Sequence, residues 1–409
     1  MIEMTDPSIE STVPLRRRLG LPLLVLYGTG ITIGAGIYVL IGQVAGHAGA
    51  YAPWSFVLAA TVMALTVASY AELSTRFPVS AGEAAYVMAA FQSRRFATAI
   101  GLMTVAIGVI SSATVTLGSA GYIQQFINLP PYLIAVAVVL FLGGVAAWGI
   151  LESVLLASVF TRDRNRRIVS SSRRSMPSFL SQRRLCRCRR RTRWCCPASP
   201  SAVCLPFLPS SGLKTWPMSW KKQGFPTVTF PAMVLTLLIS TILYVLVAAI
   251  AVSAVSVERL SSSSAPLSLV FREVAGVSPA TITAIAIVAT LNTILAQVTM
   301  AARVIYGLAR AGGLPAFLAR VHPRTGTPLI ATALVVVSVI PLALLVPLTA
   351  LAEITALTTL VIFALVNLAL LRLRDLRTTS SAPHITVPVW VPALGLVTCA
   401  AMIASALFK

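Results

Sequence analysis

Long runs of apolar residues, separated by short polar stretches, dominate this chain. About 20 helical residues cross the hydrocarbon core of a bilayer, so apolar runs of about 18 residues or more are candidate membrane spans. The candidate runs, each of which we expect to form a helix, are 21–44, 52–73, 96–123, 132–150, 231–255, 281–308, 328–346, 348–371 and 389–408. The pattern predicts an all-α polytopic membrane protein.

The composition supports this class. Of the 409 residues, 57% are hydrophobic and 11% are charged, and the mean hydropathy is +0.88, which excludes a soluble globular protein of ordinary make-up. The sequence has no Gly-x-x-x-x-Gly-Lys-Ser/Thr motif, which argues against an ATP-driven pump. His47, His322 and His384 all lie away from mid-membrane positions, so we expect no histidine proton relay. We also expect no catalytic residues, no metal and no cofactor.

Arginine is concentrated on one side of the predicted spans. It occurs before the first span at 16–18, after the second at 76, 94 and 95, after the sixth at 303–324 and after the eighth at 372–377, whereas the loops 46–51 and 124–131 have no Lys or Arg. The positive-inside rule then places the tail of residues 1–20 in the cytoplasm. We expect the protein in the cell inner membrane. The first run is too long for a cleaved signal peptide, so we expect a retained helix.

Four glycines interrupt the first span between residues 28 and 38. Irregular backbone at mid-membrane depth is tolerated only where it lines a cavity or meets a ligand, so a helix broken here would mark a transport site. Alternatively, the glycines only let helices pack closely. Spacing alone does not decide between these two interpretations.

Several polar residues are candidates for a substrate or ion path. They are Ser112 and Thr116, with Ser111 and Thr114, in the third span, and Asn292 and Gln297, with Thr293 and Thr299, in the sixth. Hydrogen bonding between helices is the alternative use of such residues.

Three carboxylates lie at predicted helix ends. Glu72 and Glu83 are expected to be solvated or paired with Arg76, with a gating role as the alternative. Glu353 lies just inside the eighth span, where it can reach water or take part in ion coupling.

A strongly basic segment separates the fourth and fifth spans. Residues 162–229 contain 13 Arg and 3 Lys against a single Asp, and five of the six cysteines. Such a segment could bind nucleic acid, anionic lipid or a metal. The cysteine spacing, with Cys186 and Cys188 followed by adjacent Cys195 and Cys196, is wrong for a metal site, and basic tracts are usually solvated disorder. We expect neither nucleic acid nor metal to bind there.

The residues around the basic segment carry a family resemblance. Four stretches in the right order resemble motifs of the amino acid permeases of the amino acid/polyamine/organocation (APC) superfamily. They are 34–40 (GAGIYVL); 71–78 (AELSTRFP) with 80–86 (SAGEAAY); 302–310 (ARVIYGLAR) with 314–315 and 321–323; and 351–360 (LAEITALTTL).

The resemblance implies an APC-type fold with inverted repeats, in which the first and sixth helices are unwound and together hold the substrate. On this basis the substrate-binding residues are Ile33, Gly34, Ala35, Gly36 and Ile37. The basic segment stands where most of the fifth helix and the sixth helix should be, and the chain stops before a further helix of the family. The division expected is a tail (1–20), helices 1–4 with the start of helix 5 (21–160), the basic segment (161–229) and helices 7–11 (230–409).

The genetic code offers an origin for the basic segment. Read from the third base of each codon, Trp216 with Pro217 forces alanine, and Trp220 with Lys221 forces glutamate. With permitted codon choices elsewhere, 206–222 becomes AFFAFIGFEDMANVVEE, which resembles the family's sixth-helix motif. A different shift turns 163–168 into IEIGGL, which resembles a continuing fifth helix. We therefore interpret about 65 residues as an out-of-frame translation.

These expectations define two hypotheses of function. The first is secondary transport of amino acids or related amines, with a proton or sodium ion or by exchange, which this chain has lost if its sixth helix is missing. The second is a non-transporting product, either a defective translation or a membrane-anchored protein whose Arg-rich loop binds acidic partners. A segment with a net charge of +15 cannot enter hydrocarbon, so we expect a disordered cytoplasmic loop in either case.

Overall fold

Each of the nine expected spans is a helix in the computed structural model of the protein. The structure describes residues 21–77, 82–148, 225–275, 279–323, 325–375 and 386–407. The tail, nearly all of the basic segment and the cysteines within it lie outside these residues. The described elements are α1 (Leu21–Ala48), η1 (Gly49–Tyr51), α2 (Ala52–Arg76), α3 (Gly82–Phe91), α4 (Arg94–Ile123), α5 (Pro131–Trp148), α8 (Phe225–Ala254), α9 (Val257–Ser262), α10 (Pro266–Ala275), α11 (Ala280–Arg310), η3 (Ala316–Ala319), α12 (Leu329–Leu345), α13 (Leu348–Asp375) and α14 (Trp390–Leu407).

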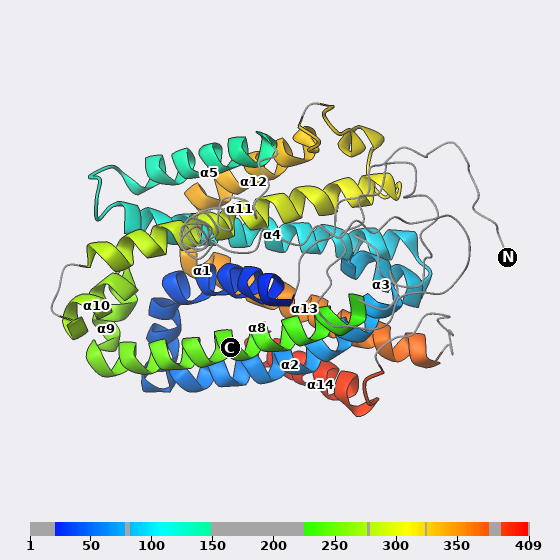
Figure 1. Ribbon diagram of the computed structural model, residues 1–409, viewed down its shortest axis with the longest axis horizontal. Helices are drawn as coiled ribbons and strands as arrows, with labels where there is room; N and C mark the ends of the chain where they lie inside the picture. Colours follow the sequence, from blue (N-terminus) through cyan, green and yellow to red (C-terminus); the bar gives the residue numbers. More distant parts are fainter. Residues whose placement is uncertain are drawn as a thin grey trace, which may run out of the picture. The chain divides into compact units, whose positions relative to one another are not determined.

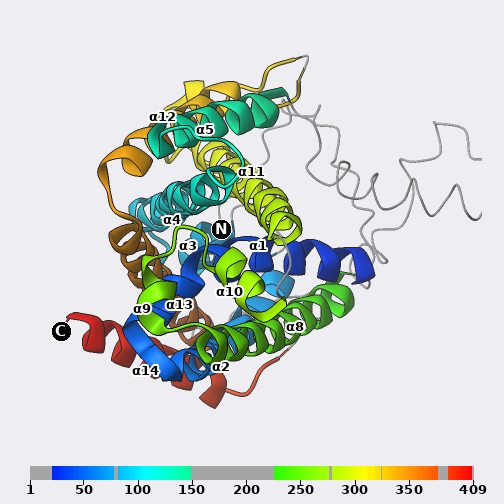
Figure 2. The same ribbon diagram turned by 90° about the vertical axis from the view of Figure 1, so that its left-hand side faces the viewer.

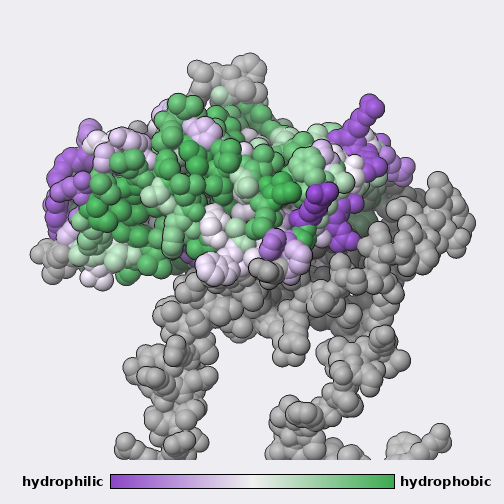
Figure 3. Space-filling view, turned by 90° about the horizontal axis from the view of Figure 1, so that it is seen from above, coloured by the Kyte–Doolittle hydropathy of each residue, from purple (hydrophilic) through white to green (hydrophobic). Residues whose placement is uncertain are grey.

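The helices have the length and composition of membrane spans. Within the described residues, six stretches are long and apolar enough to cross a bilayer, and the first, Gly36–Arg76, includes parts of both α1 and α2. The apolar helices α12 and α14 are shorter. Figure 3 shows hydrophobic residues covering the middle of one face and hydrophilic residues gathered toward its two ends. The protein is therefore an all-α, multi-pass membrane protein.

Helices from both sides of the basic segment pack into one bundle. The helix pairs α1 with α8, α2 with α8, and α4 with α11 lie side by side, as do α5 with α12 and α13 with α14. Figure 2 shows the same arrangement from the end, with α5 and α12 together on one side and α2, α8 and α14 on the other. The residues before position 149 and after position 224 thus build a common core.

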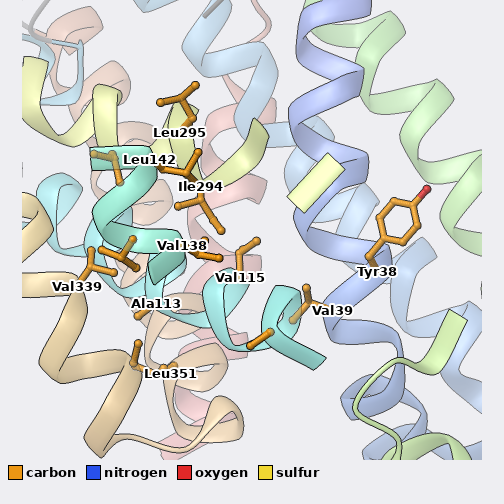
Figure 4. Close-up of a cluster of buried hydrophobic side chains, with 14 of the residues drawn as sticks. Tyr38, Val39, Ala113, Val115, Val138, Leu142, Ile294, Leu295, Val339 and Leu351 are labelled. Atoms are coloured by element: carbon orange, nitrogen blue, oxygen red, sulfur yellow. The ribbon is translucent and has the colours of Figure 1, made fainter. Parts of the chain in front are cut away.

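The core consists mainly of aliphatic side chains and alanines. Figure 4 shows Val138 and Leu142 of α5 among side chains of α4, α11 and α12, such as Val115, Ile294 and Val339. A second buried cluster joins α2, α3 and α13 through Leu73, Tyr86, Ile362, Val366 and Leu370. Because lipid tails are as apolar as these side chains, close van der Waals packing holds such helices together rather than burial from water.

Arginines gather where α2, α11 and α13 end and α4 begins. Arg94 donates a hydrogen bond to the carbonyl of Ala311 after α11 (2.6 Å), and the guanidinium of Arg372 lies 4.8 Å from the ring centre of Phe91. Arg374 of α13 pairs with Glu72 of α2. We call this the arginine-rich end of the bundle. At the other end of α13, Glu353 lies 4.0 Å from His47 of α1, and both side chains are exposed.

Three short helices, α3, α9 and α10, were not anticipated. These helices have only 6 to 10 residues. A search for apolar runs of about 18 residues or more therefore does not detect them. α3 matters most for the sites described below, because it lies beside α4 and α13 at the arginine-rich end.

Candidate functional site

The glycine-rich stretch of α1 is helical throughout. The backbone has α-helical geometry from Leu21 to Ala48, although Figure 1 shows α1 changing direction part-way along its length. The expectation of an unwound helix at residues 34–36 is therefore wrong for this structure.

Two of the glycines serve close packing. A Cβ atom at Gly34 would overlap Thr293 Oγ1 and the carbonyl oxygen of Ala289 on α11, and a Cβ at Gly36 would overlap the hydroxyl of Tyr244 on α8. That hydroxyl donates a hydrogen bond to the carbonyl oxygen of Thr32. The packing interpretation of these glycines thus describes the present structure, and residues 33–37 lie where α1 meets both α8 and α11.

Gly34→Ala is expected to destabilise the protein, whereas Gly30→Ala is not. The new Cβ at position 34 meets a main-chain carbonyl that cannot rotate away, and overpacking of this kind costs about 1–3 kcal/mol. No atom lies within 4 Å of a Cβ at Gly30, and alanine is a better helix former than glycine by up to about 1 kcal/mol. Thermal unfolding of both variants in the same detergent measures the difference. Equal melting temperatures would contradict the close contact between α1 and α11.

An apolar cavity of 440 Å³ lies beside this stretch. Ile33, Ile37 and Tyr38 of α1 line it together with side chains of α8, α10 and α11, namely Leu243, Tyr244, Val247, Ile250, Leu267, Val270, Phe271, Val274 and Ile282. In Figure 4 the side chains of Tyr38 and Val39 point in different directions, with Val39 toward α4. Among the described residues, no charged side chain lines the cavity. The segment predicted to bind substrate therefore borders a space that, as it stands, pairs neither an ammonium nor a carboxylate group.

The candidate path residues on α4 and α11 are in contact at one point. Gln297 Nε2 donates to Ser111 Oγ (3.2 Å). Ser112 and Thr116 are fully buried, and their hydroxyls donate to carbonyls one turn earlier in α4, at 2.7 Å each. Asn292 is half-buried on α11. The structure thus shows a hydrogen bond between the helices at Ser111 and Gln297. The hydroxyls of Ser112 and Thr116 donate within α4 instead.

Glu72 is fully buried in an ion cluster, so of the two alternatives expected for it, solvation or pairing with Arg76, the structure shows the pairing. Glu72 Oε1 accepts from Arg76 Nη2 at 2.5 Å and from Arg374 Nε at 3.1 Å. Glu72 Oε2 accepts from the amide of Val387 at 2.9 Å. The cluster ties the end of α2 to the end of α13 and to the connection that leads into α14. The partner Arg374 was not anticipated, because the two residues are 302 positions apart.

A second buried polar contact between α2 and α13 was also missed. The amide of Asn367 accepts from Ser69 Oγ (2.6 Å) and donates to Thr66 Oγ1 (3.2 Å), and all three residues are fully or almost fully buried. The signal in the sequence is a lone Asn inside the apolar run 348–371. Such residues commonly hydrogen-bond to a neighbouring helix.

Comparison with known proteins identifies the family. Residues 207–409 match the family model described as amino acid permease. This range includes α8 to α14 and carries two of the motif stretches quoted above. The chain belongs to the amino acid permeases of the APC superfamily. The matched range begins inside the basic segment, so it overlaps residues 207–229, which we interpret as out of frame.

Individual relatives of the permease match shorter stretches. It is 50% identical over 70 residues to cationic amino acid transporter 9, chloroplastic, of Arabidopsis thaliana, a stretch covering 17% of this chain and 12% of the relative. It is 35% identical over 114 residues to the branched-chain amino acid permease BcaP of Bacillus subtilis, covering 28% of this chain and 24% of that protein. The permease thus spans less than a quarter of the length of these relatives.

Among the described residues, no group of three or more His, Cys, Asp and Glu side chains lies close enough to hold a metal ion. Cys399 of α14 is a buried free thiol.

Proposed function

We propose that the permease is built as a secondary transporter of amino acids or related amines rather than as an enzyme. The observation that carries this proposal is the family match over residues 207–409. The names of the relatives cover both cationic and branched-chain amino acids, so lysine and leucine are the first substrates to test. Coupling to a proton or sodium ion, or exchange of one substrate for another, would drive the process.

Residues 33–37 form the substrate segment in this proposal. Support comes from the cavity that Ile33 and Ile37 border and from the bond of Tyr244 to the main chain at Thr32. For the amides of Gly34, Ala35 and Gly36 to meet a carboxylate, α1 has to open at its glycines, as the family resemblance implies. A free helix amino terminus then attracts the negative group.

The polar residues on α4 and α11 form the path in this proposal. Ser112 and Thr116 would lie along it on α4, and Asn292 and Gln297 on α11. Their support is the bond between Gln297 and Ser111, which puts polar atoms at the contact of two long, mostly apolar helices. Hydrogen bonding between the helices alone is the competing role.

The arginine-rich end faces the cytoplasm of the cell inner membrane in this proposal. The basis is the positive-inside rule, since the arginines of α2, α4, α11 and α13 lie at a common end. The tail of residues 1–20 would then be cytoplasmic as well.

We further propose that the basic segment is an out-of-frame translation and that the chain as printed does not transport. Its support is the charge of the segment and its shifted-codon pattern. The match of the printed residues 207–229 to the family model is the observation that argues against a shift in that part of the segment. An Arg-rich loop that binds acidic proteins is the competing interpretation. Independently sequenced DNA of the gene tests the proposal directly. An uninterrupted frame that encodes the printed residues would refute it.

Trypsin is expected to cut residues 162–229 before any other site. The segment has 16 Lys and Arg residues, and its charge keeps it out of the hydrocarbon. The experiment uses inside-out vesicles, in which the cytoplasmic side is accessible, with right-side-out vesicles as the control. Fragments identified by mass spectrometry give the order of cleavage. Protection of the whole tract in inside-out vesicles would contradict both the exposure and the orientation.

A further inference from the structure

A second cavity lies nearer the arginine-rich end and shares no residue with the α1 segment. It has a volume of 340 Å³ and lies between α2, α3, α4, α11 and α13. Its lining residues are Tyr70, Gly82, Glu83, Thr104, Ile107, Met300, Val304, Thr359, Ile362 and Phe363. On α11, Met300 and Val304 follow Thr293 by about two and three helical turns. The cavity therefore lies between the substrate segment of α1 and the arginine-rich end.

The polar side chains of this cavity offer hydrogen-bond acceptors. Thr104 donates its hydroxyl proton to the carbonyl of Ile100 (3.2 Å), and Thr359 donates its proton to the carbonyl of Thr355 (2.7 Å). Each hydroxyl oxygen keeps lone pairs that can accept. The hydroxyl of Tyr70 donates to Glu83 Oε1 (3.1 Å). Thr104, Thr359 and Tyr70 thus use their hydroxyl protons within the protein, and Glu83 is an acceptor.

Glu83 supplies a negative charge. It lies in the first turn of α3, where a negative charge interacts favourably with the helix dipole. Within the part of the chain that the structure describes, it forms no ion pair with a basic side chain. The arginines near the ends of the adjoining helices, Arg76 and Arg374, are bound to Glu72. Burial, and to a lesser degree the charge of Glu83, raises the pKa of Tyr86 to about 12, so this neighbouring phenol adds no charge at neutral pH.

The remaining walls suit an organic group. Aromatic rings of Tyr70 and Phe363, with centres 6.1 Å apart, lie beside the aliphatic side chains of Ile107, Val304 and Ile362 and the thioether of Met300. Aromatic faces attract cations electrostatically. A bare metal ion needs several oxygen ligands around it, whereas this cavity has few oxygen atoms and mostly carbon surface.

We propose that this cavity binds a primary ammonium ion that carries a short alkyl chain. The ammonium has three donors and no acceptor, which matches an acceptor-lined cavity whose carboxylate forms no ion pair with any described residue. Glu83 forms an ion pair with the ammonium, and the hydroxyl oxygens of Thr104 and Thr359 accept hydrogen bonds from its other N–H groups. The alkyl chain lies against Met300 and Phe363. Such a site would accept a simple amine or the side chain of a lysine-like amino acid. It does not depend on the transport proposed above, because binding needs neither a gradient nor an opening of α1.

Isothermal titration calorimetry tests this binding on the full chain in lipid nanodiscs. The probe is n-butylammonium chloride, with sodium chloride and sodium butyrate as comparison solutes. We expect saturable binding of one n-butylammonium per chain, and no saturable binding of sodium or butyrate. Glu83→Gln is expected to weaken the binding at least about tenfold, since charged hydrogen bonds are the strong ones. Thr359→Val, which keeps the side-chain shape and loses the acceptor, is expected to weaken it a few-fold.

Glu273→Gln serves as the matched control, because Glu273 is a partly exposed carboxylate on α10 that pairs with Arg259. The proposal is overturned by three results: no saturable binding of the amine, equal binding in Glu83→Gln and the unmodified protein, or preferential binding of sodium or butyrate. A butyrate site would instead indicate capture of anions by the first turn of α3. If Glu83→Gln does not fold, the affinity of Thr359→Val and Phe363→Leu for n-butylammonium tests the proposal instead. Unchanged affinity in both variants overturns it.

Discussion

Proteoliposomes that contain the chain as printed are expected to take up no amino acid above the level of empty liposomes. The described residues that line the cavity beside Ile33 and Ile37 are all apolar or tyrosine. Burying the ammonium or carboxylate of a substrate there without a partner costs several kcal/mol. A chain in which residues 163–168 and 206–222 carry the re-framed sequences is expected to show saturable uptake, because it regains a second helix at the site.

The experiment compares uptake of radiolabelled lysine and leucine by the two versions, reconstituted at equal amounts. The re-framed chain with Gly36→Leu is the inactive control, since the leucine side chain would collide with Tyr244. Saturable, substrate-specific uptake by the unmodified chain would show that the basic segment is a working part of the permease. Absence of uptake in both versions would count against residues 33–37 as the transport site.

Glu72→Gln is expected to cause the largest loss of stability among single substitutions at the arginine-rich end. The change leaves Arg76 and Arg374 without their carboxylate, and the two side chains are only 10% and 16% exposed. Removing one partner of a buried ion pair typically costs about 3–5 kcal/mol. Glu273→Gln breaks a far more exposed pair with Arg259 (2.7 Å) and is expected to cost less than about 1 kcal/mol.

Thermal unfolding of the purified permease in detergent measures both variants. Adding Arg374→Gln to Glu72→Gln is expected to cost less than the sum of the two separate changes, because each alone leaves a charge unpaired. Additive effects, or equal shifts for Glu72→Gln and Glu273→Gln, would show that the cluster does not hold α2 and α13 together.

The spans could be predicted because bilayer thickness sets the length of an apolar run. The run 52–73 became α2 and the run 348–371 became α13, each extended by a few polar residues at one end. Where a helix is short, this rule says nothing, and α3 was missed although its Glu83 borders a cavity. Local patterns determine which segments are helical much better than they determine which helices touch.

The candidate site was harder to predict for the same reason. Gly34 and Gly36 stood out in the sequence, but whether glycine opens a helix or admits a neighbour depends on Thr293 and Tyr244, which are more than 200 positions away. Glu72 looked like an ordinary helix-end carboxylate because its second partner, Arg374, belongs to another helix. Gln297 could be placed on α11 from the sequence, but its bond to Ser111 required the packing of α11 against α4.

The common core of the early and late helices has a consequence for the covalent chain itself. α1 and α2 lie against α8, and α4 lies against α11, so contacts across two separate stretches of polypeptide hold the bundle together. The peptide link between positions 148 and 225 raises the effective concentration of one stretch for the other, but it supplies none of the interactions described between them. The protein can therefore be regarded as two complementary fragments that share a fold. A break in the linking chain would lower the effective concentration of one fragment for the other and leave the contacts described between them in place.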